Sequence, residues 1–178
     1  RILIIMSSTI IFRGNEMSFD LACQEGQKYL EEGTFKKDAF IKAELIANAL
    51  LEKEPTLILA WKIKGAACAQ QDKLGEAIEC HRKIQELTPG DLENKVVLAN
   101  YLATTNQFEQ AKALYQEAIR NSPAKAVNAT YNLGKLLFQC GDYQEAEVLF
   151  QQSLPHYVSD VDAYINLGAC KFNQSDYE

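Results

Sequence analysis

Residues 127–155 read VNATYNLGKLLFQCGDYQEAEVLFQQSLP, a stretch that holds two apolar stripes at helical spacing. The first stripe consists of Tyr131, Leu133, Gly134, Leu136, Leu137 and Phe138, and the second of Ala146, Leu149, Phe150 and Leu154. Between the stripes, Gly141 is suited to the left-handed backbone conformation that ends a helix. Asp142 followed by Glu145 favours a capping box at the start of the next helix. The stretch therefore predicts a hairpin of two antiparallel helices.

The same pattern recurs along the chain with a period of 34 or 35 residues. Prolines lie at Pro55, Pro89 and Pro123, and alanines lie at Ala43, Ala77, Ala111 and Ala146. A series of small residues, Gly65, Ala99, Gly134 and Gly168, keeps the same spacing. Two helices approach closely only where one of them has almost no side chain, so the small residues predict the contacts within each hairpin. Because one hairpin cannot bury its apolar faces alone, the period predicts a stack of hairpins.

The repeated residues resemble the motif of the tetratricopeptide repeat family, which runs W-x2-L-G-x2-Y, A-x3-F and P over 34 residues. The matches are Trp61, Gly65, Ala77 and Pro89 in one unit, and Leu133, Gly134, Ala146 and Phe150 in another. The resemblance extends from Met17 to Glu178. It implies an all-α fold, a right-handed superhelical solenoid of about four antiparallel helix hairpins plus one unpaired C-terminal helix.

The repeat divides the chain into segments. Residues 1–16 have no helical rhythm and are interpreted as a non-repeat N-terminal extension, either disordered or foreign to a natural chain that starts at Met17. The repeats are residues 17–57, which diverge from the motif, then residues 58–91, 92–126 and 127–160, and a truncated repeat at residues 161–178. Pro155 comes three residues before the slot of the other prolines, so the preceding helix is expected to end near Leu154. The last helix has no covering partner within the chain, which predicts a fragment or self-association through that helix.

Composition and charge argue against several partners and cofactors. The formal net charge is -6 and basic residues are interspersed with acidic ones, so the sequence lacks the concentrated cationic face that nucleic acid needs. The apolar part of residues 1–16 is shorter than the roughly 20 residues that span a bilayer, and no membrane partner is expected. The five cysteines form no CxxC pair and do not approach a histidine at metal-ligand spacing. We therefore expect no metal, no cofactor and a reduced, cytoplasmic setting.

Recognisable catalytic motifs are also absent from the sequence. GxSxG, P-loop, HExxH and dinucleotide-binding fingerprints do not occur. His81 occupies the slot that Tyr115 and Phe150 hold in later repeats, so it is interpreted as a packed imidazole rather than a general base. The sequence therefore predicts that the chain is not an enzyme.

The family resemblance implies where a partner binds. In tetratricopeptide arrays the first helices of the hairpins line a concave groove that holds an extended or helical peptide. Carried over to this chain, the polar groove residues are Lys62, Asn100, Asn128, Tyr131, Asn132, Lys135, Asn166 and Asn173. The apolar slots on the same face include Ile63, Val96 and Val97.

Asn132 and Asn166 are the strongest candidates for contacts with a partner. A side-chain amide both donates and accepts hydrogen bonds, so it pairs with a peptide backbone of any sequence. The positions of these two residues resemble the asparagine ladder in the superhelix of O-linked N-acetylglucosaminyltransferases. In the alternative interpretation, the two asparagines only keep the groove hydrated.

These observations predict a protein–protein interaction scaffold or adaptor that binds a peptide or partner protein in the groove. The alternative is a non-catalytic, substrate-presenting arm of a larger enzyme, such as a glycosyltransferase of the O-linked N-acetylglucosaminyltransferase type. A carboxylate clamp for the acidic tails of chaperones is disfavoured, because Ala66 and Val97 stand where the clamp needs asparagines.

Overall fold

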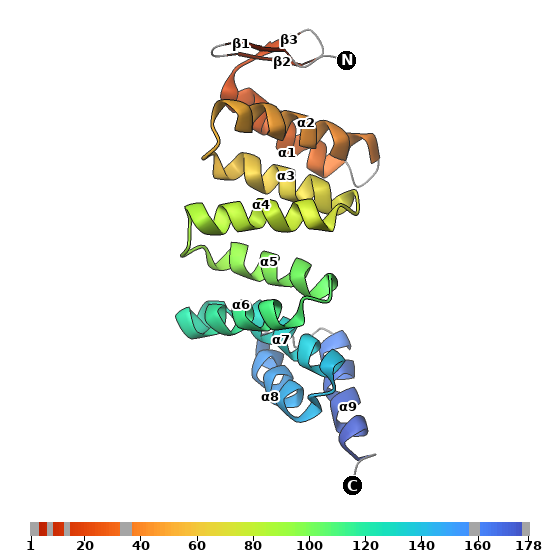
Figure 1. Cartoon of the computed structure of the whole chain (residues 1–178). Coiled ribbons are helices and arrows are strands. Elements are labelled where there is room, and N and C mark those ends of the chain that lie inside the picture. The colour runs from red at the N-terminus through yellow and green to blue at the C-terminus, as the bar shows by residue number, and fades with distance from the viewer. Residues whose placement is uncertain (1–3, 7–8, 13–14, 33–36, 157–160, 176–178) are drawn as a thin grey trace. The chain divides into compact units, whose positions relative to one another are not determined.

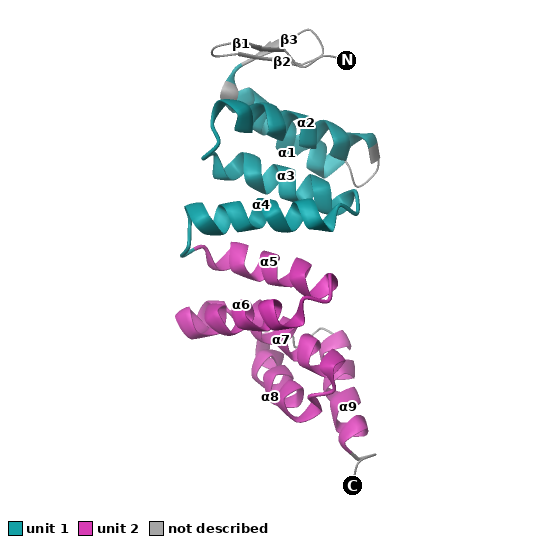
Figure 2. Cartoon of the chain, viewed as in Figure 1, with its two compact units in different colours: residues 1–90 teal, residues 91–178 magenta. Residues whose placement is uncertain are grey.

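The computed structural model describes residues 4–6, 9–12, 15–32, 37–156 and 161–175. Its elements follow one another along the chain as labelled in Figure 1. They form two compact units, residues 1–90 and residues 91–178, which Figure 2 colours separately. Helices dominate both units, so the fold is all-α. No helix in the described part of the chain is long and apolar enough to cross a bilayer.

The helices of unit 1 pack in chain order. They are α1 (Phe19–Glu32), α2 (Lys37–Lys53), α3 (Ile58–Gln70) and α4 (Leu74–Leu87). Each helix contacts the next, and α1 also contacts α3. The core between α1, α2 and α3 consists mainly of small and aliphatic side chains, which let the helices approach closely. Among them are Ala22, Ala43, Ile46, Ala47, Leu50, Ala60, Ile63 and Ala67.

A small antiparallel sheet precedes α1. Its strands are β1 (Ile4–Met6), β2 (Thr9–Phe12) and β3 (Asn15–Met17), paired in the order β1-β2-β3. In the register of β1 and β2, Ile5 lies opposite Ile10. Residues 1–16 are predicted to be a non-repeat extension, either disordered or foreign to the natural chain, and the strands correct the first of these two alternatives. Isoleucine favours strands, but runs this short carry no periodicity that identifies one.

Unit 2 continues the hairpin pattern. Its elements are α5 (Leu92–Thr104), α6 (Phe108–Asn121), the 3-10 turn η1 (Pro123–Lys125), α7 (Val127–Cys140), α8 (Tyr143–Ser153), the 3-10 turn η2 (Leu154–His156) and α9 (Val161–Ser175). Pro155 ends α8 at Ser153, as predicted from its early position. Successive helices pack against one another, and α5 also contacts α7. The first helices of two successive hairpins, α5 and α7, therefore meet within this unit.

A residue with the left-handed backbone conformation lies in the turn inside each of three hairpins. Gly141 ends α7 with φ at 88°, which confirms the conformation predicted for it. Asn106 and Asp72 hold the turns of the two preceding hairpins, with φ at 59° and 63°. Asparagine and aspartate replace glycine here because their short polar side chains tolerate this region best among the other residues.

The predicted capping box at α8 is wrong. Asp142 precedes this helix, but its side chain makes no capping hydrogen bond. The backbone ψ of Asp142 is 60°, outside the extended region from which a capping side chain reaches back to the helix. At Asp91, where ψ is 100°, the side chain does cap: its Oδ1 accepts a hydrogen bond of 3.0 Å from the Asn94 backbone N–H.

Two members of the small-residue series, Gly65 and Gly134, lie at close contacts within hairpins, as predicted, whereas Gly168 does not. A Cβ atom added at Gly134 would lie 2.9 Å from Cε1 of Phe150, and one added at Gly65 would lie 2.9 Å from Nε2 of His81. Both rings are buried, so His81 is a packed imidazole, as its slot in the repeat indicates. Gly65 and Gly134 thus each admit one ring from the second helix of their hairpin.

Candidate functional site

The contact between α5 and α7 leaves a hollow of about 550 Å3 in unit 2, called the larger hollow from here on. It is lined by Leu92, Glu93, Val96, Val97 and Asn100 from α5, by Asn128, Ala129, Tyr131 and Asn132 from α7, and by Lys125 from η1. Both helices contribute apolar side chains and side-chain amides to this lining. The volume lies within the range of about 300 to 1,000 Å3 that is typical of ligand sites.

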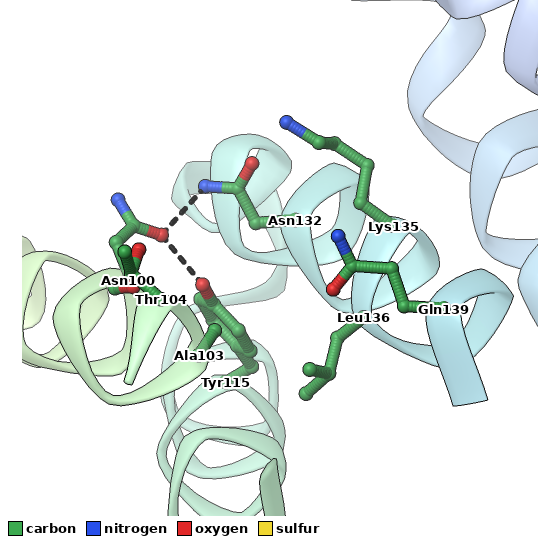
Figure 3. A pocket seen from close by; sticks show the side chains of 8 residues that line it. All are labelled: Asn100, Ala103, Thr104, Tyr115, Asn132, Lys135, Leu136 and Gln139. Carbon is green, nitrogen blue, oxygen red and sulfur yellow. Dashed lines mark hydrogen bonds between the residues drawn. The ribbon is translucent and has the colours of Figure 1, made fainter. Parts of the chain in front are cut away.

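A smaller hollow of about 270 Å3 adjoins the larger one, since Asn100 and Asn132 line both. Its other lining residues are Ala103, Thr104, Tyr115, Lys135, Leu136 and Gln139. Figure 3 shows Asn100 and Asn132 reaching toward each other from α5 and α7, while Tyr115 approaches Asn100 from α6. The smaller hollow therefore lies where side chains of three helices converge.

One oxygen atom joins these three helices. Oδ1 of Asn100 accepts a hydrogen bond of 2.5 Å from the Tyr115 hydroxyl and another of 2.9 Å from Nδ2 of Asn132. Tyr115 is only 2 % exposed, and burial raises the pKa of its phenol. The phenol thus keeps its proton at neutral pH and remains a donor. The two asparagines are half-buried, so their amides are also accessible from the hollows.

Charges at the hollows are few and of both signs. Glu93 and Lys125 line the larger hollow, and Lys135 lines the smaller one. Nζ of Lys135 lies 5.8 Å from the centre of the Tyr131 ring, which itself meets the Phe150 ring edge-on at 5.5 Å. The lining is therefore suited to a ligand whose polar groups are mainly uncharged.

The structure brings five of the eight predicted polar groove residues to these two hollows. They are Asn100, Asn128, Tyr131, Asn132 and Lys135. All five lie on α5 or α7, the two first helices that contact each other in unit 2.

The other three predicted residues lie elsewhere. Lys62 is on α3 in unit 1, and Asn166 and Asn173 are on α9. Nδ2 of Asn166 donates a hydrogen bond of 2.8 Å to the Tyr131 hydroxyl, which links α9 to α7. Nδ2 of Asn173 donates to the backbone oxygen of Ala169, also at 2.8 Å. Neither asparagine lines either hollow.

The predicted groove position of Ile63 is wrong. Its side chain is 1 % exposed and belongs to the core of unit 1. A Cβ atom added at Gly26 would lie 3.2 Å from Cδ1 of Ile63, so α1 covers this part of α3. The first repeat diverges from the motif, and the repeat pattern alone does not reveal how closely its first helix approaches the next one.

Tyr115 is a functional candidate that the sequence analysis misses. It occupies the slot of His81 and Phe150, so the pattern assigns it to the core, where it is indeed buried. The hydroxyl is what distinguishes it from Phe150. A polar atom in a buried slot signals a hydrogen-bond partner, which here is Asn100.

A cluster of Glu44, Cys68 and Glu76 in unit 1 places three ligand-type atoms within 4.8 Å of one another. The residues around it do not suit a metal ion. Oε2 of Glu44 already accepts hydrogen bonds from Nζ of Lys73 at 2.8 Å and from Nε2 of Gln71 at 2.7 Å. Burial raises the pKa of Cys68 to about 11, so at neutral pH it is a thiol rather than the thiolate that binds metals. The cluster is therefore an ion pair beside a packed cysteine.

Comparisons with known proteins agree with the repeat pattern. Residues 96–157 match the family model of the tetratricopeptide repeat. The peroxisomal targeting signal receptor of Kluyveromyces lactis is 29% identical over 133 residues, which make up 74% of this chain and 23% of the receptor. The chain thus spans less than a quarter of the length of that relative.

Solved structures share the fold across most of the chain. The MamA protein superposes with a TM-score of 0.77 at 18% identity, over 88% of this chain and 82% of its own. A tetratricopeptide repeat protein from Parabacteroides merdae gives a TM-score of 0.75 at 20% identity, over 89% of this chain and 61% of its own. Identities this low establish the fold alone, and the similarity to the tetratricopeptide repeat family comes from the matched segment. The chain thus has the fold of tetratricopeptide repeat proteins, and its residues 96–157 match that repeat.

Proposed function

We propose that the chain is a protein-interaction scaffold whose unit 2 binds an extended peptide segment of a partner protein across the two hollows. The observation that carries this proposal is the meeting of side-chain amides from two successive first helices. Asn100 and Asn132 line both hollows, and Asn128 lines the larger one. An extended peptide offers backbone C=O and N–H groups along its length, and amides pair with both whatever the peptide's sequence.

The apolar part of the lining supports a peptide rather than a small polar ligand. Val96, Val97 and Tyr131 line the larger hollow and provide surface for apolar side chains of the bound segment. Glu93 and Lys125 carry opposite charges at the same hollow, so the site has no strong preference for a charged ligand. Polar anchors beside apolar surface are the usual composition of ligand sites in proteins.

The test begins with a random phage-displayed peptide library panned on the folded chain, followed by calorimetric titration of the enriched peptide. Replacing Asn128→Ala together with Asn132→Ala, which both line the larger hollow, should weaken binding about tenfold or more, since a hydrogen bond contributes about 1 kcal/mol. Helical content measured by circular dichroism should stay unchanged. Asn121→Ala is the matched control, because it removes an exposed amide from the end of α6.

Equal affinity of the double variant and the unaltered chain would refute the role of the amides. Failure of the library to yield any peptide that binds the folded chain would refute the peptide-binding function itself.

The curated relative favours a second candidate, recognition of a targeting signal, because that relative is a peroxisomal targeting signal receptor. A peptide ending in Ser-Lys-Leu is such a signal. Fluorescence anisotropy with this labelled peptide should show saturable binding if the second candidate is correct. The same peptide with its last three residues reversed is the control, and equal anisotropy for both peptides would count against targeting-signal recognition.

We further infer a non-catalytic role, in keeping with the scaffolds typical of this repeat family. The alternative of a substrate-presenting arm of a larger enzyme stays a prediction, which the sequences of longer proteins that contain this segment would test. A cytoplasmic location is also inferred, because all five cysteines are free thiols, as expected in a reducing compartment. Fractionation of the source cells would test the location.

A further inference from the structure

We infer that Tyr115 is a positioning residue that fixes the side-chain amide of Asn100 with Nδ2 available to the smaller hollow. The site then offers a hydrogen-bond donor at Asn100 and an acceptor at Asn132. This pair complements the C=O and N–H groups of a single stretch of peptide backbone. The inference rests on the proposed peptide-binding function and specifies what that site selects.

The hydrogen bonds at Asn100 leave only one face of its amide for a ligand. An amide oxygen has two lone pairs, and at Asn100 they are taken by the Tyr115 hydroxyl at 2.5 Å and Nδ2 of Asn132 at 2.9 Å. Nδ2 of Asn100 makes no hydrogen bond to the described part of the chain. A ligand atom that binds Asn100 in this orientation must therefore be an acceptor, such as a peptide carbonyl oxygen.

Tyr115 decides between the two orientations of this amide. If the Asn100 amide were turned by 180°, its Nδ2 could donate to both the Tyr115 oxygen and Oδ1 of Asn132. The proton of the buried phenol would then have no acceptor. An unsatisfied buried donor disfavours the turned state by about tenfold or more in population. Figure 3 shows the Tyr115 hydroxyl and Asn132 converging on the one oxygen of Asn100.

The orientation of the Asn100 amide also fixes the orientation of the Asn132 amide. Its Nδ2 donates to Asn100, and its Oδ1 makes no hydrogen bond to residues that the structure describes. Because Asn132 also lines both hollows, this oxygen is the acceptor that the site offers to a backbone N–H group. One buried hydroxyl on α6 thus sets the donor and acceptor pattern presented by α5 and α7.

The repeat itself supplies the substitution that removes this hydroxyl without removing the ring. Phe150 occupies the equivalent slot of the next hairpin and is 1 % exposed there, so Tyr115→Phe keeps a side chain that the slot accommodates. Tyr143→Phe is the matched control. Tyr143 belongs to the same unit and packs against Phe138 at 5.2 Å between ring centres, away from the two asparagines.

The test measures solvent exchange of side-chain amide protons by NMR in the free, isotope-labelled chain. In the unaltered chain, one Nδ2 proton of Asn132 should exchange more slowly than those of Asn100. In Tyr115→Phe the turned state becomes populated, so protection should appear at Asn100 and fall at Asn132. Tyr143→Phe should leave both patterns unchanged. Identical exchange in Tyr115→Phe and the unaltered chain, or a joint loss of protection at both amides, would overturn the inference.

A second measurement connects the orientation to binding. The peptide enriched from the random library should bind Tyr115→Phe about twofold more weakly than the unaltered chain, because about half of the variant then holds the amide in the wrong orientation, with no change for Tyr143→Phe. Equal affinity, with the amide turned according to NMR, would overturn the selection of backbone groups. If no peptide binds the unaltered chain, the proposed function fails, while the exchange experiment still decides the orientation on its own.

Discussion

At the scale of single residues, close packing of each hairpin depends on positions that have no side chain. Gly134 faces Phe150 and Gly65 faces His81, and a Cβ atom at either glycine would come within 2.9 Å of the opposing ring. Gly168 occupies the same slot of the last repeat, but a Cβ atom there would meet no atom of the described residues within 4 Å. The same residue type therefore has different consequences at two equivalent positions.

Alanine substitutions at these two glycines should change stability in opposite directions. Gly134→Ala should lower the free energy of unfolding by about 1 to 3 kcal/mol, because the buried Phe150 ring cannot yield without strain. Gly168→Ala should raise it by about 0.5 to 1 kcal/mol, since alanine restricts the unfolded chain and favours helix. Urea unfolding followed by circular dichroism measures both. Shifts of the same sign would contradict the packing described for Gly134.

The sequence predicts the slots of these residues but not the direction of their polar groups. The 34-residue period correctly assigns His81 and Phe150 to the interior, because burial follows helical spacing. The hydrogen bond from Tyr115 to Asn100 joins residues on different helices. It depends on how α5 and α6 pack, and no local pattern encodes that geometry.

At the scale of elements, polar side chains tie neighbouring helices together at their turns. Glu44 on α2 accepts hydrogen bonds from Gln71 and Lys73, which lie in the turn between α3 and α4. Burial acts to raise the pKa of Glu44, but these hydrogen bonds and the Lys73 charge outweigh it and hold the pKa below its usual value of 4.5. The ionised form of Glu44 therefore stabilises unit 1.

The lowered pKa of Glu44 predicts how stability depends on pH. Its contribution is fully present above pH 4.5, the value in the unfolded chain, and is lost as pH falls toward the lower folded value. Glu44→Gln should be less stable than the unaltered chain at about pH 7, and the difference should shrink at about pH 3.5. Urea midpoints at both pH values provide the measurement. A constant difference would show that ionisation of Glu44 does not contribute.

Helix ends were predictable where a single residue determines them. Gly141 ends a helix because glycine readily adopts the left-handed conformation, and Pro155 does so because its ring restricts the backbone; both properties act in any context. The capping box at Asp142 failed because capping depends on the backbone angle that the preceding turn imposes. The three strands before α1 were missed for a related reason: pairing between short segments is not visible in either segment alone.

At the scale of the whole molecule, the distribution of cysteines provides a simple probe of the fold. Cys23, Cys68, Cys80 and Cys170 are buried, and Cys140 at the end of α7 is exposed. Burial raises the pKa of Cys68 to about 11 and that of Cys80 to about 12. The buried thiols are therefore shielded from reagents and also poorly ionised.

Thiol labelling of the native chain should accordingly begin at Cys140. At about pH 8, iodoacetamide should modify this residue first, and Cys140→Ser should abolish the fast phase while urea exposes the other four. Mass spectrometry of peptides after short exposure identifies the labelled site. Rapid labelling of Cys68 or Cys80 in the native chain would contradict the packing of α3 against α4.

The identity of the partner is not predictable at this scale, because groove side chains vary freely on a constant repeat frame. The segment that matches the family model, residues 96–157, contains most of the lining of both hollows. The family pattern predicts eight polar groove residues, of which five line these hollows and three lie outside them. The three residues lie outside because the repeat pattern predicts only which face of a helix a residue is on. The position of the hollows depends also on which helices contact each other.

NMR titration of the isotope-labelled chain with the library-selected peptide shows whether the two hollows bind that peptide. The side-chain amide signals of Asn100, Asn128 and Asn132 should shift together as the peptide saturates the site. The signal of Asn121, at the end of α6, should stay in place. Saturable binding that leaves these three amides unchanged, or that shifts only signals from unit 1, would contradict peptide binding at the two hollows.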